Sequence, residues 1–190
     1  MEVVLSILLG IGLSAACGFR LFVPLLVVSI ASYSGHLTLA ESFEWVGTTP
    51  ALVLFGVATV VEIAGYYIPW VDNLLDSIAL PAAVVAGTVV TASVVTDMSP
   101  LLRYTLALIA GGGAAVTVKG LTAIVRAGSS LTTGGLANPV VSTGEAIGSL
   151  LLSVLAILLP LVAGILAIGL VLLSARKIRS WLGRRRARSS

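Results

Sequence analysis

The longest apolar run of the chain, from Ala146 to Ser174, contains no charged residue. A helix needs about 20 apolar residues to cross a bilayer, and Pro160 near the centre of the run favours a tight hairpin of two helices. Only 10% of the 190 residues are charged and 58% are hydrophobic, whereas soluble domains carry about 25% charged residues. The sequence therefore predicts one all-α, polytopic helical membrane domain with no separate soluble module.

About six transmembrane helices are expected in this domain. The first apolar segment is longer than one crossing requires, and Pro24 removes a backbone hydrogen bond to Arg20, so we predict a break near residues 18–20. A single bent helix in the last run would reduce the number of spans to five. The expected spans are 3–32, 50–68, 78–95, 101–125 and a hairpin within 146–174, with a polar, proline-started element at 69–76 and irregular backbone at 128–139.

Small residues form a stripe in the first segment. Gly10, Ser14 and Gly18 are spaced four apart, so they lie on one face of a helix and let another helix approach closely. Because other segments are also rich in Gly and Ala, we expect such faces to need partners. The pattern predicts close helix packing and favours a homo-oligomer.

Three short motifs recur in the same order in the two halves of the chain. The first is a Gly- and Ala-rich stretch that ends in a basic residue, the second begins with Glu62 or Glu145, and the third is Val-Ala-Gly after a proline. Each motif alone carries little weight in so Gly- and Ala-rich a chain. Together they favour two inverted three-helix repeats, 1–97 and 98–175.

Basic residues are concentrated at the end of the chain. A basic run beside a membrane span indicates a cytoplasmic C-terminus that contacts anionic lipid headgroups. The loop 33–49 has no Lys or Arg and suits the opposite side, so six spans would place both termini inside. We expect 1–175 to be the membrane domain and 176–190 a basic tail that binds no nucleic acid. Its basic residues are Arg176, Lys177, Arg179, Arg184, Arg185, Arg186 and Arg188.

Four ionisable residues interrupt the apolar segments: Arg20, Glu62, Lys119 and Glu145. A charge at the centre of a membrane helix costs roughly 2.5–3.5 kcal/mol on insertion scales. In the structural interpretation, Arg20 neutralises Glu62, and Lys119 neutralises Glu145. Lys119 could also extend towards the nearer interface, and Glu145 could cap the start of a helix.

In the functional interpretation, the same charges line a polar cavity, with Glu62 as its acidic centre and Arg20 as the counter-charge. Carboxylate and amide oxygens suit protons or hard cations. The basic residues argue against a metal cage, so we expect no metal and no cofactor. The residues predicted to form this ion or substrate pathway are Arg20, Glu62, Asp72, Asp76, Lys119, Asn138, Ser142 and Glu145.

An enzyme is not expected. The one histidine, His36, lies in an outer loop, and the chain contains no nucleophile elbow, Walker loop or cysteine cluster. The hypothesis is a small transporter or channel-like permease for an ion or small polar solute, with proton coupling as one form of it. The alternative is a non-transporting membrane scaffold or assembly protein whose buried ion pairs are structural.

The chain resembles an uncharacterised bacterial family of polytopic integral-membrane proteins, known as a domain of unknown function. The resemblance lies in residues 20–24, 62–69, 72–87 and 138–145. It implies a multispan fold in a bacterial cytoplasmic (inner) membrane and no particular activity. The family pattern has further acids where this chain has Gly65 and Ala146, which weakens a metal-site interpretation.

Overall fold

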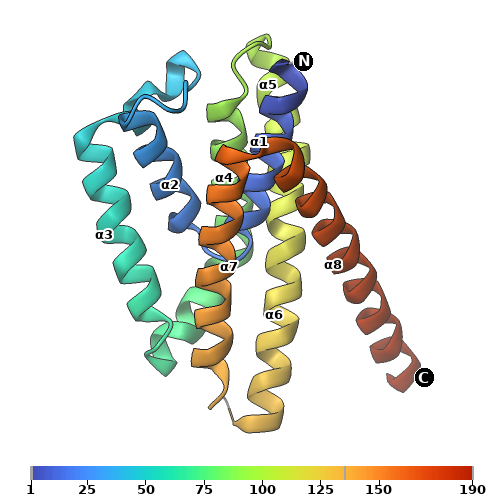
Figure 1. Ribbon diagram of the computed structural model, residues 1–190. Coiled ribbons are helices and arrows are strands. Elements are labelled where there is room, and N and C mark those ends of the chain that lie inside the picture. Colours follow the sequence, from blue (N-terminus) through green and yellow to red (C-terminus); the bar gives the residue numbers. More distant parts are fainter. Residues whose placement is uncertain (1, 135, 190) are drawn as a thin grey trace.

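The computed structural model describes residues 2–134 and 136–189 and shows helices joined by short turns, with no strand among these residues. The predicted all-α class is confirmed. The elements are α1 (Glu2–Cys17), α2 (Phe22–Tyr33), η1 (Glu41–Gly47), α3 (Thr49–Gly65), α4 (Pro69–Val94), α5 (Pro100–Leu106), η2 (Ala107–Gly112), α6 (Gly113–Thr133), α7 (Asn138–Leu158) and α8 (Pro160–Ser189). Figure 1 shows them as one upright bundle with α3 and α8 on its flanks.

The first apolar segment folds into a helical hairpin. The chain leaves the helix after Cys17 and re-enters one at Phe22, so the expected break near residues 18–20 is present. α1 descends from the N-terminal end of the bundle and α2 returns towards it (Figure 1). Both helices lie against α7. Arg20 therefore lies at the tip of the hairpin, inside the bundle, and not in the middle of a continuous membrane-spanning helix.

Four helical stretches are long and apolar enough to cross a membrane: 70–94, 100–133, 138–158 and 160–183. The bent pair η1 and α3 would make a fifth. The expected number of six is not reproduced, because α1 and α2 are each shorter than a span. Figure 1 places the N- and C-termini towards opposite ends of the bundle, and the membrane side of each terminus stays a prediction.

Two segments expected to be irregular are helical. The polar element at 69–76 is the beginning of α4, because Pro69 starts a helix that continues without a break to Val94. The segment 128–139 contains an irregular connection only between Thr133 and Asn138. The hairpin expected at Pro160 is confirmed, with α7 ending at Leu158 and α8 beginning at Pro160.

Helix backbones approach closely where α1, α4 and η2 meet, a contact that we call the small-residue seam (Gly10, Ser14, Gly87, Thr91 and Gly111). Ser14 Oγ donates to the Gly87 carbonyl at 2.7 Å, and Thr91 Oγ1 donates to the Gly10 carbonyl at 3.1 Å. A Cβ at Gly87 would lie 2.8 Å from the Gly111 carbonyl oxygen. The stripe predicted in the first segment is thus a packing surface.

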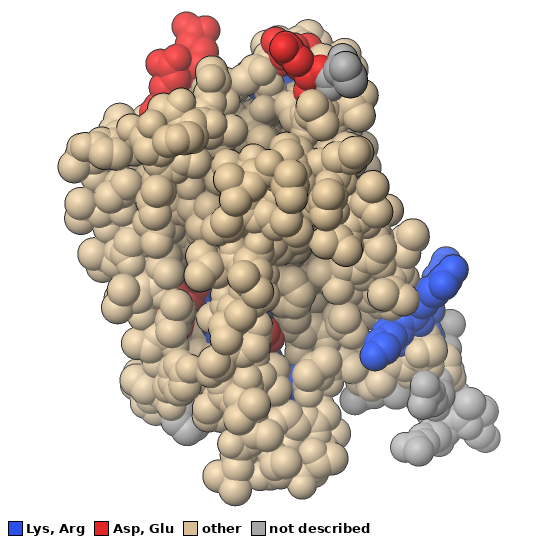
Figure 2. All heavy atoms as spheres, viewed as in Figure 1, with Lys and Arg blue, Asp and Glu red and all other residues tan. Residues whose placement is uncertain are grey.

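Charge is distributed unevenly along the bundle. Figure 2 shows acidic side chains at the upper end, basic ones at the lower right, and a few charged atoms showing through the lower half of an otherwise uncharged face. Glu41 and Glu44 are exposed in η1, whereas Arg176, Lys177 and Arg179 are exposed on α8. Helix α8 runs through the expected boundary at residue 175, and the two-repeat division stays a prediction.

Candidate functional site

Charged side chains from five parts of the bundle meet in its lower half: the hairpin tip, α3, α4, α6 and α7. We call this group the ionic cluster; its members are Arg20, Glu62, Asp72, Asp76, Lys119, Arg126 and Glu145. All except Asp76 are buried. Asp72 lies in the first turn of α4 and Glu62 in the last turn of α3, so the cluster lies nearer one end of the bundle than its middle.

Arg126 is the centre of this cluster. Its Nη1 donates to Asp72 Oδ1 at 2.5 Å, its Nη2 to Glu145 Oε2 at 2.8 Å, and its Nε to Glu145 Oε1 at 3.1 Å. Asp76 Oδ2 lies 3.7 Å from Arg126 Nη1. A planar guanidinium suits this bidentate geometry, and every side-chain nitrogen of Arg126 has a partner. Arg126 therefore joins α4, α6 and α7.

Arg20 reaches α7 from the hairpin tip. Its Nη2 donates to the Ser142 carbonyl at 2.8 Å and to the Ser142 hydroxyl, and lies 3.5 Å from Glu145 Oε2. Its Nε and Nη1 have no hydrogen-bond partner among the described residues, although the side chain is almost wholly buried. Buried donors without partners cost about 1–3 kcal/mol each. The contact with Ser142 thus uses only part of the guanidinium.

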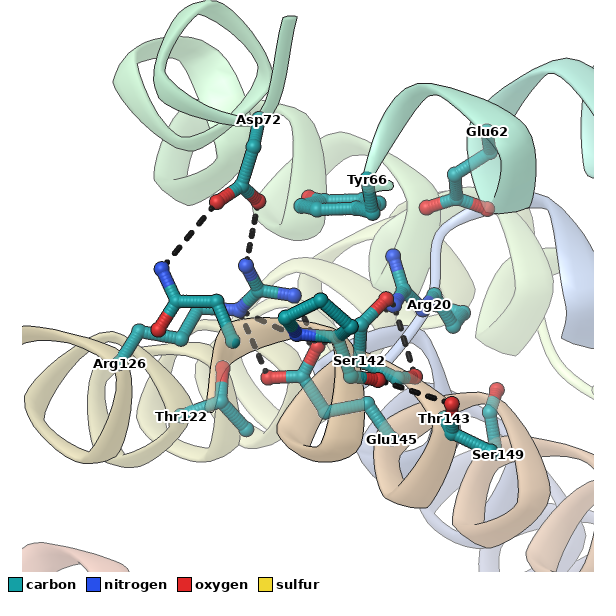
Figure 3. A network of polar contacts seen from close by, with 12 residues as sticks. Arg20, Glu62, Tyr66, Asp72, Thr122, Arg126, Ser142, Thr143, Glu145 and Ser149 are labelled. Carbon is teal, nitrogen blue, oxygen red and sulfur yellow. Dashed lines mark hydrogen bonds and ion pairs between the residues drawn. The ribbon is translucent and has the colours of Figure 1, made fainter. Parts of the chain in front are cut away.

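The Tyr66 ring is shared by the three cations of the cluster. The guanidinium carbon of Arg20 lies 3.8 Å from the ring centroid, that of Arg126 4.4 Å, and Lys119 Nζ 5.4 Å. Figure 3 shows the ring between Asp72 and Glu62, above the arginines. Each such cation–π contact contributes about 0.5–2 kcal/mol. The Tyr66 ring thus stabilises three positive charges close together, including pairs that have no carboxylate between them.

Lys119 and Asp76 form the loosest part of the cluster. Lys119 Nζ lies 3.4 Å from the Tyr66 hydroxyl and 3.9 Å from Asp76 Oδ1. The Asp76 side chain is 32% exposed, and its Oδ1 has no hydrogen-bond partner within the described chain. Asp76 is therefore the member of the cluster that solvent reaches.

Glu62 stands apart from the ion pairs. Its two carboxylate oxygens accept the backbone N–H groups of Leu21 at 2.8 Å and Phe22 at 3.0 Å. No Lys, Arg or His of the described residues lies within 4.0 Å of it. Glu62 caps the first turn of α2, where a negative charge is favoured by the helix dipole, and ties α3 to the hairpin tip.

Asn138 and Ser142 complete the predicted set. Asn138 Nδ2 lies 3.4 Å from Asp72 Oδ2 and 3.2 Å from Ser130 Oγ. The structure therefore brings together all eight residues expected on the pathway. Among the described residues, no group of three or more His, Cys, Asp or Glu side chains is arranged to hold a metal ion.

The expected pairing of the charges is wrong in detail. Arg20 pairs with Glu145 and not with Glu62, because the hairpin turns its tip towards α7. Lys119 faces Asp76, and it is buried rather than extended to an interface. Glu145 is not a cap: α7 begins at Asn138, so Glu145 lies about two turns inside the helix, where it binds two arginines.

Two residues at the centre of the candidate site were not predicted from the sequence. Arg126 was treated as the end of a span, but α6 continues to Thr133 and buries it. Its spacing of seven from Lys119, two helical turns, is the signal that could have placed both on one face. Tyr66 carries no such signal, because its role depends on three residues from other helices.

The fold and the cluster define a multi-pass helical membrane protein with a buried ionic site near one end of its bundle. The chain belongs to the family described as "Domain of unknown function (DUF4126)", whose sequence model matches residues 7–180. No curated protein and no solved structure matches the chain.

Proposed function

We propose that the protein is a small, proton-coupled permease for an ion or small polar solute. The observation that supports this is the charge balance of the ionic cluster. Three cations, Arg20, Lys119 and Arg126, are enclosed with four carboxylates, so the group is neutral only when one extra positive charge is present. A proton or a monovalent cation supplies that charge at low energetic cost in a low-dielectric site.

Two carboxylates are proposed to exchange the proton. Asp76 is partly exposed and held only by contacts of 3.7 and 3.9 Å, so it is the outer group. Glu62 lies further inside and binds no cation of the described chain, so it is the inner acceptor. Arg126, whose donors are all used, binds Asp72 and Glu145 and keeps the frame of the site fixed.

The orientation is also a proposal. The exposed basic residues of α8 lie towards the same end of the bundle as the ionic cluster, and exposed acids lie at the other end. Under the positive-inside rule the basic end is cytoplasmic, in a bacterial inner membrane, with the basic C-terminal segment at anionic lipid headgroups. Asp76 would then face the cytoplasm. A homo-oligomer is also proposed. The stripe on α1 is used inside the chain, so the proposal rests on helix glycines that meet nothing within 4 Å, such as Gly144 and Gly148.

Proton flux in proteoliposomes tests this function. Vesicles containing a pH-sensitive dye are given a potassium diffusion potential with valinomycin, and parallel vesicles are given Na⁺ or K⁺ gradients. We expect the protein to raise the flux of H⁺, Na⁺ or K⁺ several-fold over protein-free vesicles. Asp76→Asn and Glu62→Gln should return the rate to background with a melting temperature within a few degrees of the wild type. Glu41→Gln, at the opposite end, is the matched control.

A scaffold is the second candidate, and the complete bonding of Arg126 favours it. In that case the cluster only fixes the arrangement of α4, α6 and α7. Equal flux of all three cations with and without protein, together with a large loss of stability in Asp76→Asn, would support the scaffold and contradict the permease.

A further inference from the structure

A groove of about 750 Å³ runs between α3 and α4 beside the ionic cluster. Its volume lies within the range of about 300–1,000 Å³ that small-molecule sites occupy. The walls are apolar except for Glu62 and Tyr66, and Val57 and Val61 on the wall are more than half exposed. The groove is thus open along its length to the lipid side of the bundle.

Charged groups stand at one end of this groove. Glu62 lines it and uses one lone pair of each oxygen for α2, which leaves acceptor capacity and no cationic partner in the described chain. Arg20 directly precedes two lining residues, Leu21 and Phe22. In Figure 3 its guanidinium points towards the space between Tyr66 and Glu62. The two unpartnered nitrogens of Arg20 therefore lie behind the charged end of the groove.

The charged end lies close to a membrane surface. Glu62 is three residues from the end of α3, or about 4.5 Å along the helix axis. Tyr67 and Trp70, which follow it, are 49% and 71% exposed. Exposed Tyr and Trp side chains mark the level of lipid headgroups. A headgroup at that level reaches Glu62 by moving inward by about one helical turn, with its acyl chain remaining along the apolar wall.

We propose that the groove between α3 and α4 is a binding site for a zwitterionic phospholipid with a primary ammonium, of the phosphatidylethanolamine type. The ammonium donates to Glu62, the phosphate oxygens accept from Arg20, and an acyl chain lies along α3 and α4. This occupant matches both charges at the end of the groove. A lipophilic cation would leave the Arg20 donors unpartnered, and a fatty acid would place a second carboxylate against Glu62.

This site does not depend on the proposed transport, because a bound lipid provides partners for Glu62 and Arg20 whether or not protons move through the cluster. Native mass spectrometry of the detergent-purified full chain measures it directly. Dioleoyl-phosphatidylethanolamine and dioleoyl-phosphatidylglycerol are titrated in parallel. We expect one molecule of the ethanolamine lipid to bind at least tenfold tighter than the glycerol lipid, whose headgroup has no cation for Glu62.

Two variants and one control test whether the lipid binds in this groove. Ala58→Phe places a ring in the groove and should reduce binding of the ethanolamine lipid about tenfold, whereas Ala127→Phe, exposed on α6, should leave it unchanged. Glu62→Gln should remove the preference over the glycerol lipid without abolishing binding of either. Equal affinity of the wild type for both lipids, or undiminished binding by Ala58→Phe, would overturn the proposal and indicate ordinary annular lipid.

Discussion

The small-residue seam and the ionic cluster both include α4, and they join it to different neighbours by opposite means. In the seam, α1, α4 and η2 meet through glycines and hydroxyls, with backbones so close that a single Cβ at Gly87 or Gly111 has no room. In the ionic cluster, long charged side chains from the hairpin tip, α6 and α7 bridge a wider space, and several polar atoms lack partners in the described chain. Side-chain volume determines which helices can meet in the seam, and charge determines which side chains meet in the cluster.

The difference shows where this membrane protein is rigid. Helices in lipid gain no hydrophobic free energy from association, so close van der Waals packing carries much of their stability. The seam has that packing and satisfies its hydroxyls internally. The cluster has incompletely bonded Arg20 and solvent-reached Asp76, so it is the part that can respond to a proton or a ligand.

The largest effect is expected at the centre of the cluster. Arg126→Ala leaves Asp72 and Glu145 buried without their main partner, and breaking such a buried pair costs about 3–5 kcal/mol. Thermal unfolding in detergent should show the loss. Arg179→Ala, exposed on α8, is the matched control and should shift stability by about 0.5 kcal/mol or less. Equal stability of the two variants would mean that the ion pairs of Arg126 contribute nothing.

A smaller effect is expected in the seam. Gly87→Ala brings a methyl within 2.6 Å of Ala115 Cβ and 2.8 Å of the Gly111 carbonyl, so helices must separate at a cost of about 1–3 kcal/mol. Gly144→Ala on α7 meets nothing within 4 Å and should be neutral or stabilising by up to about 1 kcal/mol. Unfolding midpoints of the two purified variants compare them. A harmless Gly87→Ala would contradict backbone contact at the seam.

Ser14→Ala tests the hydrogen bonds of the seam without adding volume. The change removes a donor to Gly87 and a partner of Thr91, and interhelical hydrogen bonds in membranes average about 0.6 kcal/mol. Ser6→Ala on the same helix is the control, because Ser6 bonds only within α1, to the Val3 carbonyl. Chemical unfolding should resolve the pair. A loss of stability several times larger would mean that hydroxyl hydrogen bonds, rather than close backbone packing, hold the seam together.

Lys119→Met should have the smallest effect. The amine makes only contacts of 3.4 and 3.9 Å, and the partly exposed Asp76 can be hydrated when Lys119 is absent. We expect a loss of about 0.5 kcal/mol or less, at the low end for a partly exposed ion pair, measured by the same thermal unfolding. If the loss matched that of Arg126→Ala, the cluster would act as one unit and the division between its tight and loose parts would be wrong.

Sequence reasoning reached the helical class, the break before Pro24 and the seam, because these depend on local residue types and spacing. It also selected six of the seven charged side chains of the ionic cluster, since charges in and beside apolar segments are conspicuous. The ion pairs could not be predicted from the sequence, because Arg20 meets Glu145 only when the first segment folds back as a hairpin. The same reversal explains the overcounted spans. Arg126 was missed because its helix extends further than its apolar stretch indicated.

The hairpin tip also constrains the order in which the protein can assemble. Arg20 bonds to Ser142, which lies 122 residues later in the chain, so the ribosome completes most of the protein before that partner exists. Until then the first segment carries an unpaired cation into the bilayer or waits at its surface. The N-terminal hairpin is therefore synthesised first but completes its contacts last. Variants that weaken α7 should leave the N-terminal hairpin of newly synthesised chains incorrectly inserted in the membrane.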